Sequence, residues 1–478
     1  MVTRGIGIWL LECAFVRPFV ILLIAGCLTT ASAETIVLKN GKRIYADTVR
    51  QAATKVEYDI GDNTFIIPAR LVERVQEGGS PVVAPPPKPI TEMLGDSALP
   101  SSQSSALLRN GKPDPDYLEQ IDNGSDPERA AAAYNAVGRW EAQYGTPAQA
   151  LRYFERALTL APEDANIRVS YAALLVNQGR TSEAISHAER AAQSAPNQPE
   201  VFMVLGYAYS SANRAKDAAR AWKRSVELRP DSNVQALLDK AEKEATTSAG
   251  YTQQDSTHFT IHYEGRRVSP DFTREIVTTL ESHYDELASA FGSSPRTDIA
   301  VYLYTEREFF DITQAPSWIS AVNDGKLRIP VEGLTSVTPK LSRVLKHELA
   351  HSFVASISHA RCPTWLNEGI AQMLEPRSSA QYGGYLARLY RNKQQLPMSA
   401  LQTSFMRLAD QQGATAYTQS LAAVEYINDT YGMSDLIRIL ERIGEGSSPE
   451  AALRATIHSG YDQFEQELSE HLIRKYGN

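Results

Sequence analysis

Apolar residues between positions 341 and 354 recur at intervals of three and four. They stand at 341, 344, 345, 349, 353 and 354. This spacing is typical of a helix that packs one face into a core. A second apolar series, at 366, 370, 373 and 374, follows the loop that ends with Cys362, Pro363 and Thr364. The pattern therefore predicts two consecutive helices, the second beginning at Trp365.

Two segments upstream have the pattern of β-strands. Residues 300–304, Ala-Val-Tyr-Leu-Tyr, are apolar and aromatic throughout and predict a buried strand. Residues 323–330, Asn-Asp-Gly-Lys-Leu-Arg-Ile-Pro, predict a later strand bounded by a turn and a proline, which suits the edge of a sheet. Further on, residues 422–427 and 435–442 have helical spacing. We therefore expect an α+β region over 255–478 with a helical second half.

Residues 128–245 repeat with a period of 34 residues. The equivalent positions are Pro162, Pro196 and Pro230; Gly145, Gly179 and Asn213; Ala150, Ala184 and Ala218; and Ala157, Ala191 and Ser225. Small residues at helix contacts and a proline at the end of each unit make this segment resemble tetratricopeptide repeats. The resemblance implies an all-α stack of helical hairpins that binds a protein partner on its concave face. A spacer that holds the rest of the chain at a distance is the alternative.

Residues 34–76 predict a small β unit. Asn40-Gly41 between two apolar segments is the signal of a two-residue hairpin turn, and residues 56–60 and 64–67 add a second hairpin. So short a unit has a marginal core, and we expect it to depend on contacts with a partner or with the rest of the chain. Residues 77–127 are rich in proline and serine and are predicted to form a linker.

Residues 1–33 have the pattern of an export signal. Arg4 and Arg17 precede an apolar stretch that is short for a membrane span, and small residues end it at Ala31-Ser32-Ala33, where cleavage is expected. Alternatively, Ile24-Ala-Gly-Cys27 resembles a bacterial lipobox, in which case a lipidated Cys27 would anchor the chain to a membrane. An uncleaved anchor is a third interpretation. Each predicts an exported protein of a bacterium, whether periplasmic, secreted or a membrane-anchored lipoprotein.

Composition restricts the kinds of molecule that the chain can bind. The chain has 478 residues, enough for several domains, and a net charge of −8 at pH 7. That charge, with no basic stretch interleaved with aromatic residues, argues against nucleic acid as the main partner. Cys362 is the one cysteine beyond the predicted leader, so the mature chain cannot form an internal disulfide.

The first predicted helix contains the sequence His347-Glu348-Leu349-Ala350-His351. Histidines four positions apart lie on one face of a helix, so both imidazoles can reach a single metal ion. Glu348 follows the first histidine, where its carboxylate can approach a water on that ion rather than the ion itself. This pattern predicts a zinc-dependent hydrolase of peptide bonds. The alternative is two histidines on a solvated helix face.

A catalytic zinc usually has a third protein ligand. Val354 and Ile357 stand where the longer metzincin pattern has a glycine and a third histidine, which excludes that class. His359 lies in the loop after the helix. Glu368, near the start of the second helix, can face back toward the histidines and fits better. The alternative for Glu368 is a first-turn glutamate stabilised by the helix dipole.

His-Glu-Leu-Ala-His followed by Pro-Thr-Trp-Leu-Asn-Glu-Gly-Ile-Ala resembles the gluzincins, the peptidase MA-like metallopeptidases, over residues 255–478. The resemblance implies a zincin-like fold that binds one Zn²⁺ per chain, with Glu348 as the general base. It implies as metal ligands His347, His351 and Glu368. The chain departs from the family at Gln372, where the best-known gluzincins have an aspartate that accepts a hydrogen bond from the first histidine. An amide oxygen can accept this bond only more weakly.

Two further residues near the motif are candidates. Tyr417 could donate to the oxyanion of the tetrahedral intermediate, because related enzymes often supply a downstream tyrosine or histidine. The chain has 22 tyrosines, so a place at the edge of the core is the alternative. Cys362 lies close to the ligands in sequence, and a reactive or metal-binding role is weighed against that of a half-buried loop residue.

The combined prediction is a multidomain protein with a small β unit, an all-α repeat stack and an α+β metallopeptidase domain. It would be an exported zinc peptidase whose repeats recruit a protein substrate or another protein partner. The alternative is a non-catalytic binding and assembly protein with a vestigial hydrolase fold. Glu348 argues against this alternative, because zinc binding alone would not need it.

Overall fold

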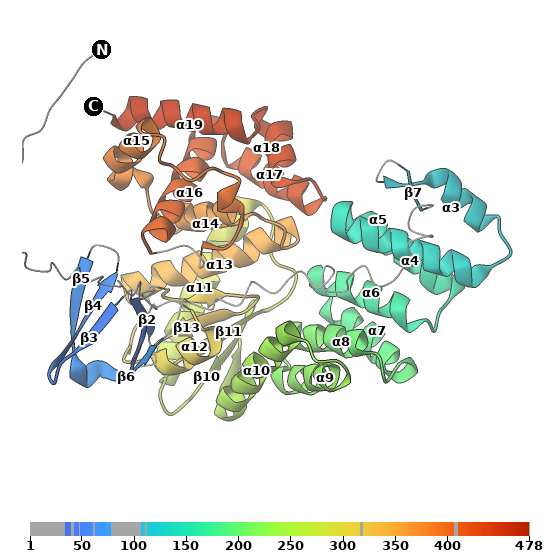
Figure 1. The fold of residues 1–478 in the computed structure, drawn as a ribbon, viewed down its shortest axis with the longest axis horizontal. Coiled ribbons are helices and arrows are strands. Elements are labelled where there is room, and N and C mark those ends of the chain that lie inside the picture. The colour runs from blue at the N-terminus through green and yellow to red at the C-terminus, as the bar shows by residue number, and fades with distance from the viewer. Residues whose placement is uncertain are drawn as a thin grey trace, which may run out of the picture.

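The computed structural model describes residues 34–77 except 40–42, 47 and 61–62, and residues 107–477 except 110–111, 316–318 and 406–409. The predicted export signal, with Cys27, lies outside the described residues. Figure 1 shows the multidomain architecture in chain order: the small β unit in blue, the helical stack in teal and green, and the mixed sheet and its helices from yellow to red.

Two three-stranded antiparallel sheets make up the small β unit. The first has the order β2-β1-β6 and the second β3-β4-β5. The strands are β1 (Glu34–Leu38), β2 (Arg43–Ala46), β3 (Thr48–Gln51), β4 (Lys55–Ile60), β5 (Asn63–Pro68) and β6 (Val72–Glu77). Both predicted hairpins are present, as the pairs β1–β2 and β4–β5, while the Asn40-Gly41 turn lies outside the described residues. The sequence did not predict β3 or β6, which complete the two sheets.

The linker prediction for residues 77–127 is wrong for its last part. The described residues there form β7 (Leu108–Arg109), β8 (Lys112–Pro113) and α3 (Pro115–Asp122). Asp114 caps α3 by accepting from the backbone N–H of Asp116 at 3.1 Å. Leu118 and Ile121 are buried in one cluster with Tyr134 of the first repeat. This apolar face ends the stack, which explains why the segment folds.

The repeats form three helical hairpins and one final helix. Their elements are α4 (Pro127–Tyr144), α5 (Pro147–Leu160), α6 (Ala165–Asn177), α7 (Thr181–Ser194), α8 (Pro199–Ser211), α9 (Ala215–Leu228) and α10 (Ser232–Thr247). The repeated alanines, among them Ala150 and Ala184, are fully buried where neighbouring helices meet. Gly179 and Asn213 take the left-handed conformation after α6 and α8, with φ of 71° and 58°. Gly145, at the equivalent position, has a φ of −112°.

A five-stranded mixed sheet follows, in the order β12-β13-β11-β10-β9. Its elements are β9 (Thr252–Asp255), β10 (Phe259–Tyr263), α11 (Pro270–Phe291), β11 (Ile299–Tyr304), α12 (Glu306–Thr313), β12 (Val322–Asn323) and β13 (Leu327–Pro330). The buried strand predicted at 300–304 is β11. The edge strand predicted over 323–330 is wrong, because that segment folds back on itself. β12 forms the edge, and β13 lies inside the sheet, parallel to β11.

The side chains of β11 alternate between two cores. Val301 and Leu303 belong to the large core that includes α11 and α13, whereas Tyr302 and Tyr304 belong to a second cluster with Phe309 of α12. Burial on both faces explains why this strand is apolar and aromatic without interruption.

Helices make up the rest of the chain. They are α13 (Pro339–Ser358), α14 (Thr364–Leu374), α15 (Gly383–Arg391), α16 (Asp410–Tyr431), α17 (Met433–Gly444), α18 (Pro449–Ile457) and α19 (Tyr461–Tyr476). The two consecutive helices predicted around the histidine motif are α13 and α14, and the predicted helical second half is α14–α19. Among the described residues, none of the helices has the length and apolar character needed to cross a membrane.

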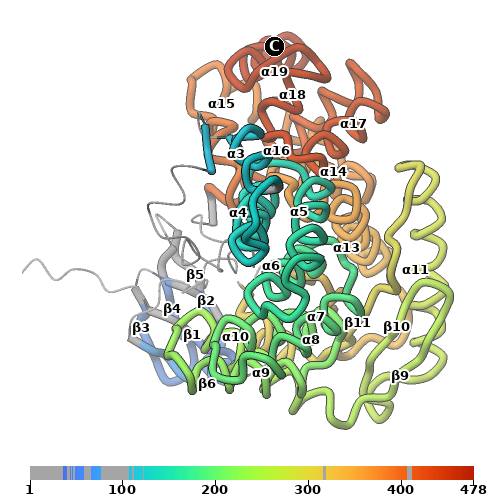
Figure 2. The backbone as a smooth tube through the Cα atoms, turned by 90° about the vertical axis from the view of Figure 1, so that its right-hand side faces the viewer, coloured from blue at the N-terminus to red at the C-terminus, as the bar shows by residue number. Residues whose placement is uncertain are grey.

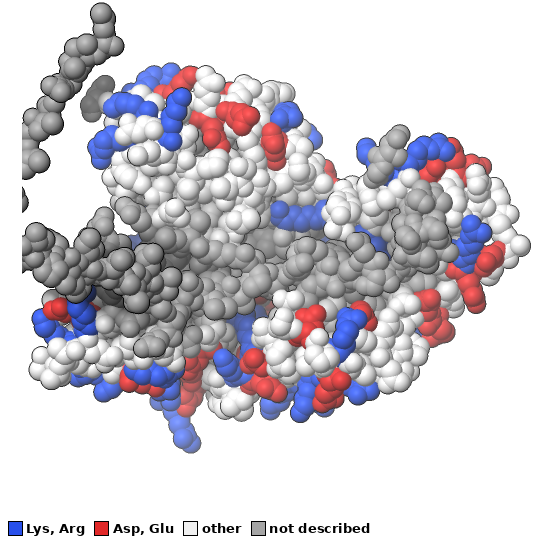
Figure 3. Space-filling view, in the orientation of Figure 1, with Lys and Arg blue, Asp and Glu red and all other residues white. Residues whose placement is uncertain are grey.

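The repeat stack runs along one side of the C-terminal region, as the view turned by 90° shows (Figure 2). On the face drawn in Figure 3, acidic and basic side chains of the described repeats are intermixed rather than separated by sign. The last repeat helix, α10, packs against α12. The stack therefore touches the mixed sheet directly.

Candidate metal centre

The residues of the motif lie on α13. The helix begins after Thr338, whose hydroxyl accepts from the backbone N–H of Leu341, and Pro339 occupies its first turn. Leu345, Leu349 and Phe353 are fully buried on its core face. Burial of such side chains contributes about 1.5–3 kcal/mol each. The core contacts of α13 therefore hold the motif rigidly.

The structure brings His347 and His351 together with Glu368 of α14. Their nitrogen and oxygen atoms lie within 4.8 Å of one another. Oε2 of Glu368 lies 3.5 Å from Nε2 of His347 and 3.8 Å from Nε2 of His351. Donor atoms about 2.1 Å from a shared zinc in tetrahedral geometry stand roughly 3.4 Å apart. The three predicted ligand side chains thus converge on one point.

The other nitrogen of each imidazole faces an acceptor that the sequence analysis missed. Nδ1 of His351 lies 2.9 Å from Oδ1 of Asn367, and Nδ1 of His347 lies 3.5 Å from Oε2 of Glu375. These partners turn both Nε2 atoms toward Glu368. Glu375 stands two helical turns after Glu368, so the spacing along α14 was the signal that could have revealed it.

Gln372 does not take the place of the missing aspartate. Its side-chain amide donates to the backbone oxygen of Tyr417, at 3.0 Å, and to that of Glu368, at 3.2 Å. Gln372 therefore connects α14 to α16, and Glu375 is the residue that faces Nδ1 of His347.

Family comparison agrees with this geometry. Residues 281–471 match the family model described as Peptidase MA superfamily, and residues 141–201 and 175–241 match the tetratricopeptide repeat. Residues 281–471 therefore form a Peptidase MA superfamily domain, and tetratricopeptide repeats precede it over residues 141–241. No curated protein is similar enough to count as a relative.

The peptidase MA domain holds a cavity of about 310 Å³ at the motif. His347, Glu348 and Glu368 line it, together with Tyr417 of α16 and Asn323 at the sheet edge. Tyr417 is part of this wall, as expected of a candidate donor, and its ring packs at right angles to that of Phe405.

Neither His359 nor Cys362 belongs to the ligand cluster formed by His347, His351 and Glu368 among the described residues. His359 ends α13 in the left-handed conformation, with a φ of 50°, as expected of a loop residue. Cys362 is partly buried and packs against the large core, and burial raises the pKa of its thiol well above the ordinary value. A raised pKa favours the thiol over the thiolate that binds metals.

The charges of the peptidase MA site are mutually dependent. Burial opposes the charged form of His347, but the carboxylates of Glu368 and Glu375 outweigh burial and raise its pKa to about 10. Burial raises the pKa of Glu348, despite the two nearby histidines. Burial also opposes the charged form of Glu368, yet His351 and His347 hold its pKa below the ordinary value.

The residues present fit a divalent metal ion. Two imidazoles and a carboxylate form a ligand set that zinc commonly takes. Asn367 lies within hydrogen-bond distance of the outer nitrogen of His351, and Glu375 lies 3.5 Å from that of His347. Three buried or partly buried acidic residues, Glu348, Glu368 and Glu375, surround the two histidines. A cation at the convergence point would balance the negative charge that remains after Arg377 pairs with Glu375.

Proposed function

We propose that this protein is a zinc-dependent peptidase that hydrolyses peptide bonds. The convergence of the two Nε2 atoms on Oε2 of Glu368, with Glu348 beside them in one cavity, carries this proposal. A zinc ion held by these ligands, one per chain, would polarise the scissile carbonyl and make water a nucleophile at neutral pH. Glu348 takes a proton from the attacking water and returns it to the leaving amine.

Two more parts of the cavity wall support the substrate. The hydroxyl of Tyr417 stabilises the oxyanion of the tetrahedral intermediate. Among the described residues, β12 is the outermost strand of the sheet, and an extended peptide can lie along its outer edge. A Tyr417→Phe variant should bind zinc normally and lose about 10- to 1,000-fold in kcat, measured with a fluorogenic peptide. An unchanged kcat would remove Tyr417 from the mechanism.

The decisive experiment compares the wild type with Glu348→Gln. Each protein is assayed for zinc content and for hydrolysis of unfolded casein. We expect about one zinc per chain in both, and a loss of at least ~100-fold in activity for the variant only, because it has no general base. Asp285→Asn, an equivalent change on the exposed face of α11, serves as the matched control and should behave as the wild type.

Two outcomes would count against the proposal. Zinc binding by the wild type without cleavage of any substrate would favour a non-catalytic binding protein, in which the repeats do the work. Unchanged zinc content in Glu368→Ala would reassign the third ligand.

For the rest of the chain we propose recruitment and export. Tetratricopeptide repeats suggest protein–protein interaction, so the stack would recruit the protein substrate or a partner. Residues 1–33 would direct export, with or without lipidation of Cys27. Membrane recovery of the wild type but not of Cys27→Ser would identify lipidation, whereas equal recovery in the soluble exported fraction would favour cleavage after Ala33.

A further inference from the structure

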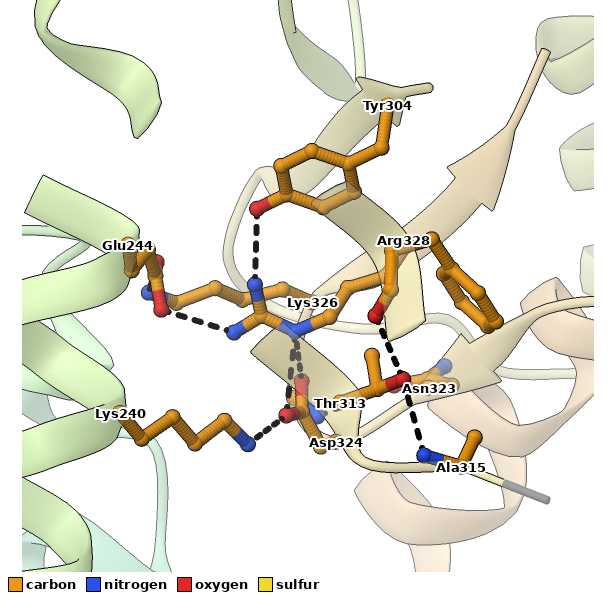
Figure 4. Close-up of polar contacts among 11 residues, drawn as sticks. Lys240, Glu244, Tyr304, Thr313, Ala315, Asn323, Asp324, Lys326 and Arg328 are labelled. Atoms are coloured by element: carbon orange, nitrogen blue, oxygen red, sulfur yellow. Dashed lines mark hydrogen bonds and ion pairs between the residues drawn. The ribbon is translucent and has the colours of Figure 1, made fainter. Parts of the chain in front are cut away.

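The last repeat helix meets the mixed sheet through a buried ionic cluster (Figure 4). Glu244 of α10 is only 4% exposed. Its Oε1 lies 2.5 Å from Nζ of Lys326, and its Oε2 lies 3.0 Å from Nη2 of Arg328. Lys326 and Arg328 belong to the turn and strand β13 of the β12–β13 hairpin, and both are themselves buried. One carboxylate from the repeats therefore pairs with two cations of the peptidase domain.

Three further residues complete the cluster: Lys240, Tyr304 and Asp324. Nε of Arg328 donates to Oδ1 of Asp324 at 2.9 Å, and Nη1 donates to the hydroxyl of Tyr304 at 3.0 Å. Lys240, one turn before Glu244 on α10, lies 2.5 Å from Oδ2 of Asp324. Without Glu244, Lys326 would lose its ion-pair partner, and Arg328 would keep only Asp324, which Lys240 shares. Buried charges without partners are strongly unfavourable, so the hairpin position depends on α10.

The same hairpin carries the edge of the catalytic cavity. The side-chain amide of Asn323 donates to the backbone oxygen of Glu348 at 2.7 Å and to the hydroxyl of Ser352 at 2.8 Å. Residues 319–323 line the cavity. The hairpin thus joins α10 on one side to the general-base residue on the other.

The other end of the stack touches the ligand helices. Arg361 lies in the loop between α13 and α14, and its guanidinium donates to the backbone oxygens of Ala142, at 2.6 Å, and Gly145, at 3.3 Å. These carbonyls end helix α4, where a cation is favoured. The stack is therefore attached at both ends to elements next to the metal centre: the sheet edge that lines the cavity and the loop between α13 and α14.

We propose that Glu244 is a positioning residue for peptide binding, which acts through Lys326 and Arg328 to hold the β12 edge against the cavity. The proposal rests on the proposed function, because it assigns β12 to the substrate. In this view the repeats are part of the binding site and not only a recruitment module. The substrate class that depends on Glu244 is an extended peptide long enough to pair with β12.

The experiment uses the full exported chain and its Glu244→Gln variant. Glu242→Gln, an exposed glutamate on the same helix, is the matched control. We expect KM for a peptide of about ten residues to rise roughly tenfold, equal to the loss of one or two backbone hydrogen bonds. kcat and zinc content should stay near wild type, since the ligands and Glu348 are untouched. Amide hydrogen exchange over residues 319–330 should become faster. Partial unfolding would instead lower kcat and leave KM unchanged.

A second variant approaches the contact from the sheet side. Lys326→Met should reproduce the rise in KM. The double variant should raise KM no further than the single variant with the larger effect, because both substitutions remove the same Glu244–Lys326 contact. Additive effects, or wild-type KM and exchange in Glu244→Gln, would overturn the positioning role while leaving the peptidase proposal intact. An inactive wild type would refute the peptidase proposal, and the exchange measurement would still decide whether Glu244 holds the hairpin.

Discussion

At the scale of single residues, orientation of the imidazoles is the most informative feature of the site. His351 is directed by a neutral amide, Asn367, and His347 by a carboxylate, Glu375. A carboxylate partner makes the ligating nitrogen more basic than an amide does. Glu375 thus supplies what the aspartate of better-known gluzincins supplies, from a position three residues later in the chain.

Replacement of Glu375 tests this assignment. Glu375→Gln should lower zinc affinity by about 10- to 100-fold, because His347 loses its anionic partner. Gln372→Met, on the same helix, removes an amide that binds only backbone oxygens and should leave the affinity near wild type. Competition with a chromogenic chelator measures both. Equal losses in the two variants would show that helix packing, and not the His347 contact, is responsible.

At the scale of secondary-structure elements, the two helices of each repeat hairpin have side chains of complementary size where they touch. A Cβ at Gly138 would lie 2.7 Å from the ring of Phe154, and one at Gly206 would lie 2.4 Å from the indole of Trp222. In the middle repeat, Ala172 and Ala188 stand at the corresponding positions of one buried cluster. A large ring therefore pairs with glycine, while two alanines pair with each other, so each helix pair keeps a close packing distance.

Gly206→Ala should consequently destabilise the stack. We expect a decrease of about 1–3 kcal/mol in the free energy of unfolding, measured with urea, because the rigid indole cannot move aside freely. Gly250→Ala is the control, since nothing lies within 4 Å of its added Cβ. In a Trp222→Leu background, Gly206→Ala should lower the free energy of unfolding by a smaller amount. The same cost in both backgrounds would exclude the indole as the cause.

At the scale of the whole molecule, the two-ended attachment makes the repeats and the peptidase domain one mechanical unit. The α10 end uses buried ion pairs, and the α4 end uses a guanidinium on helix carbonyls. Buried ion pairs contribute little net stability but specify geometry, since any other arrangement leaves a charge without a partner. A protein bound on the repeats would thereby act on the β12 edge through α10.

This junction should weaken in acid. Burial opposes the charged form of Glu244, but Arg328 and Lys326 outweigh it and hold its pKa below the ordinary value of 4.5. A lowered pKa stabilises the folded state fully above pH 4.5, and this contribution is lost as the pH falls through the folded-state pKa. The stability difference between wild type and Glu244→Gln should therefore shrink between about pH 5 and pH 3 in urea titrations. A constant difference would show that Glu244 does not titrate with folding.

Local sequence patterns determined much of this protein. The 34-residue period predicted the helical hairpins, because each unit repeats the same small contact residues. The three- and four-residue spacing around His347 predicted α13, and Trp365 marked α14 to within one residue. The motif also named the side chains that the structure brings together at the metal centre. Such features depend on neighbours along one helix, so the sequence alone encodes them.

Other features depend on contacts between distant segments, and only the tertiary structure decided them. Residues 323–330 form a hairpin with β12 at the edge of the sheet and β13 inside it, and its Lys326 and Arg328 pair with Glu244 more than 80 positions earlier. The choice of Glu375 over Gln372 as the partner of His347 depends on how α14 packs against α13 and α16. Residues from Leu107 onward fold into β7, β8 and α3 because they pack against the apolar end of the repeat stack. Burial and charge neutralisation are properties of the assembled fold, so local spacing cannot reveal which distant residue completes them.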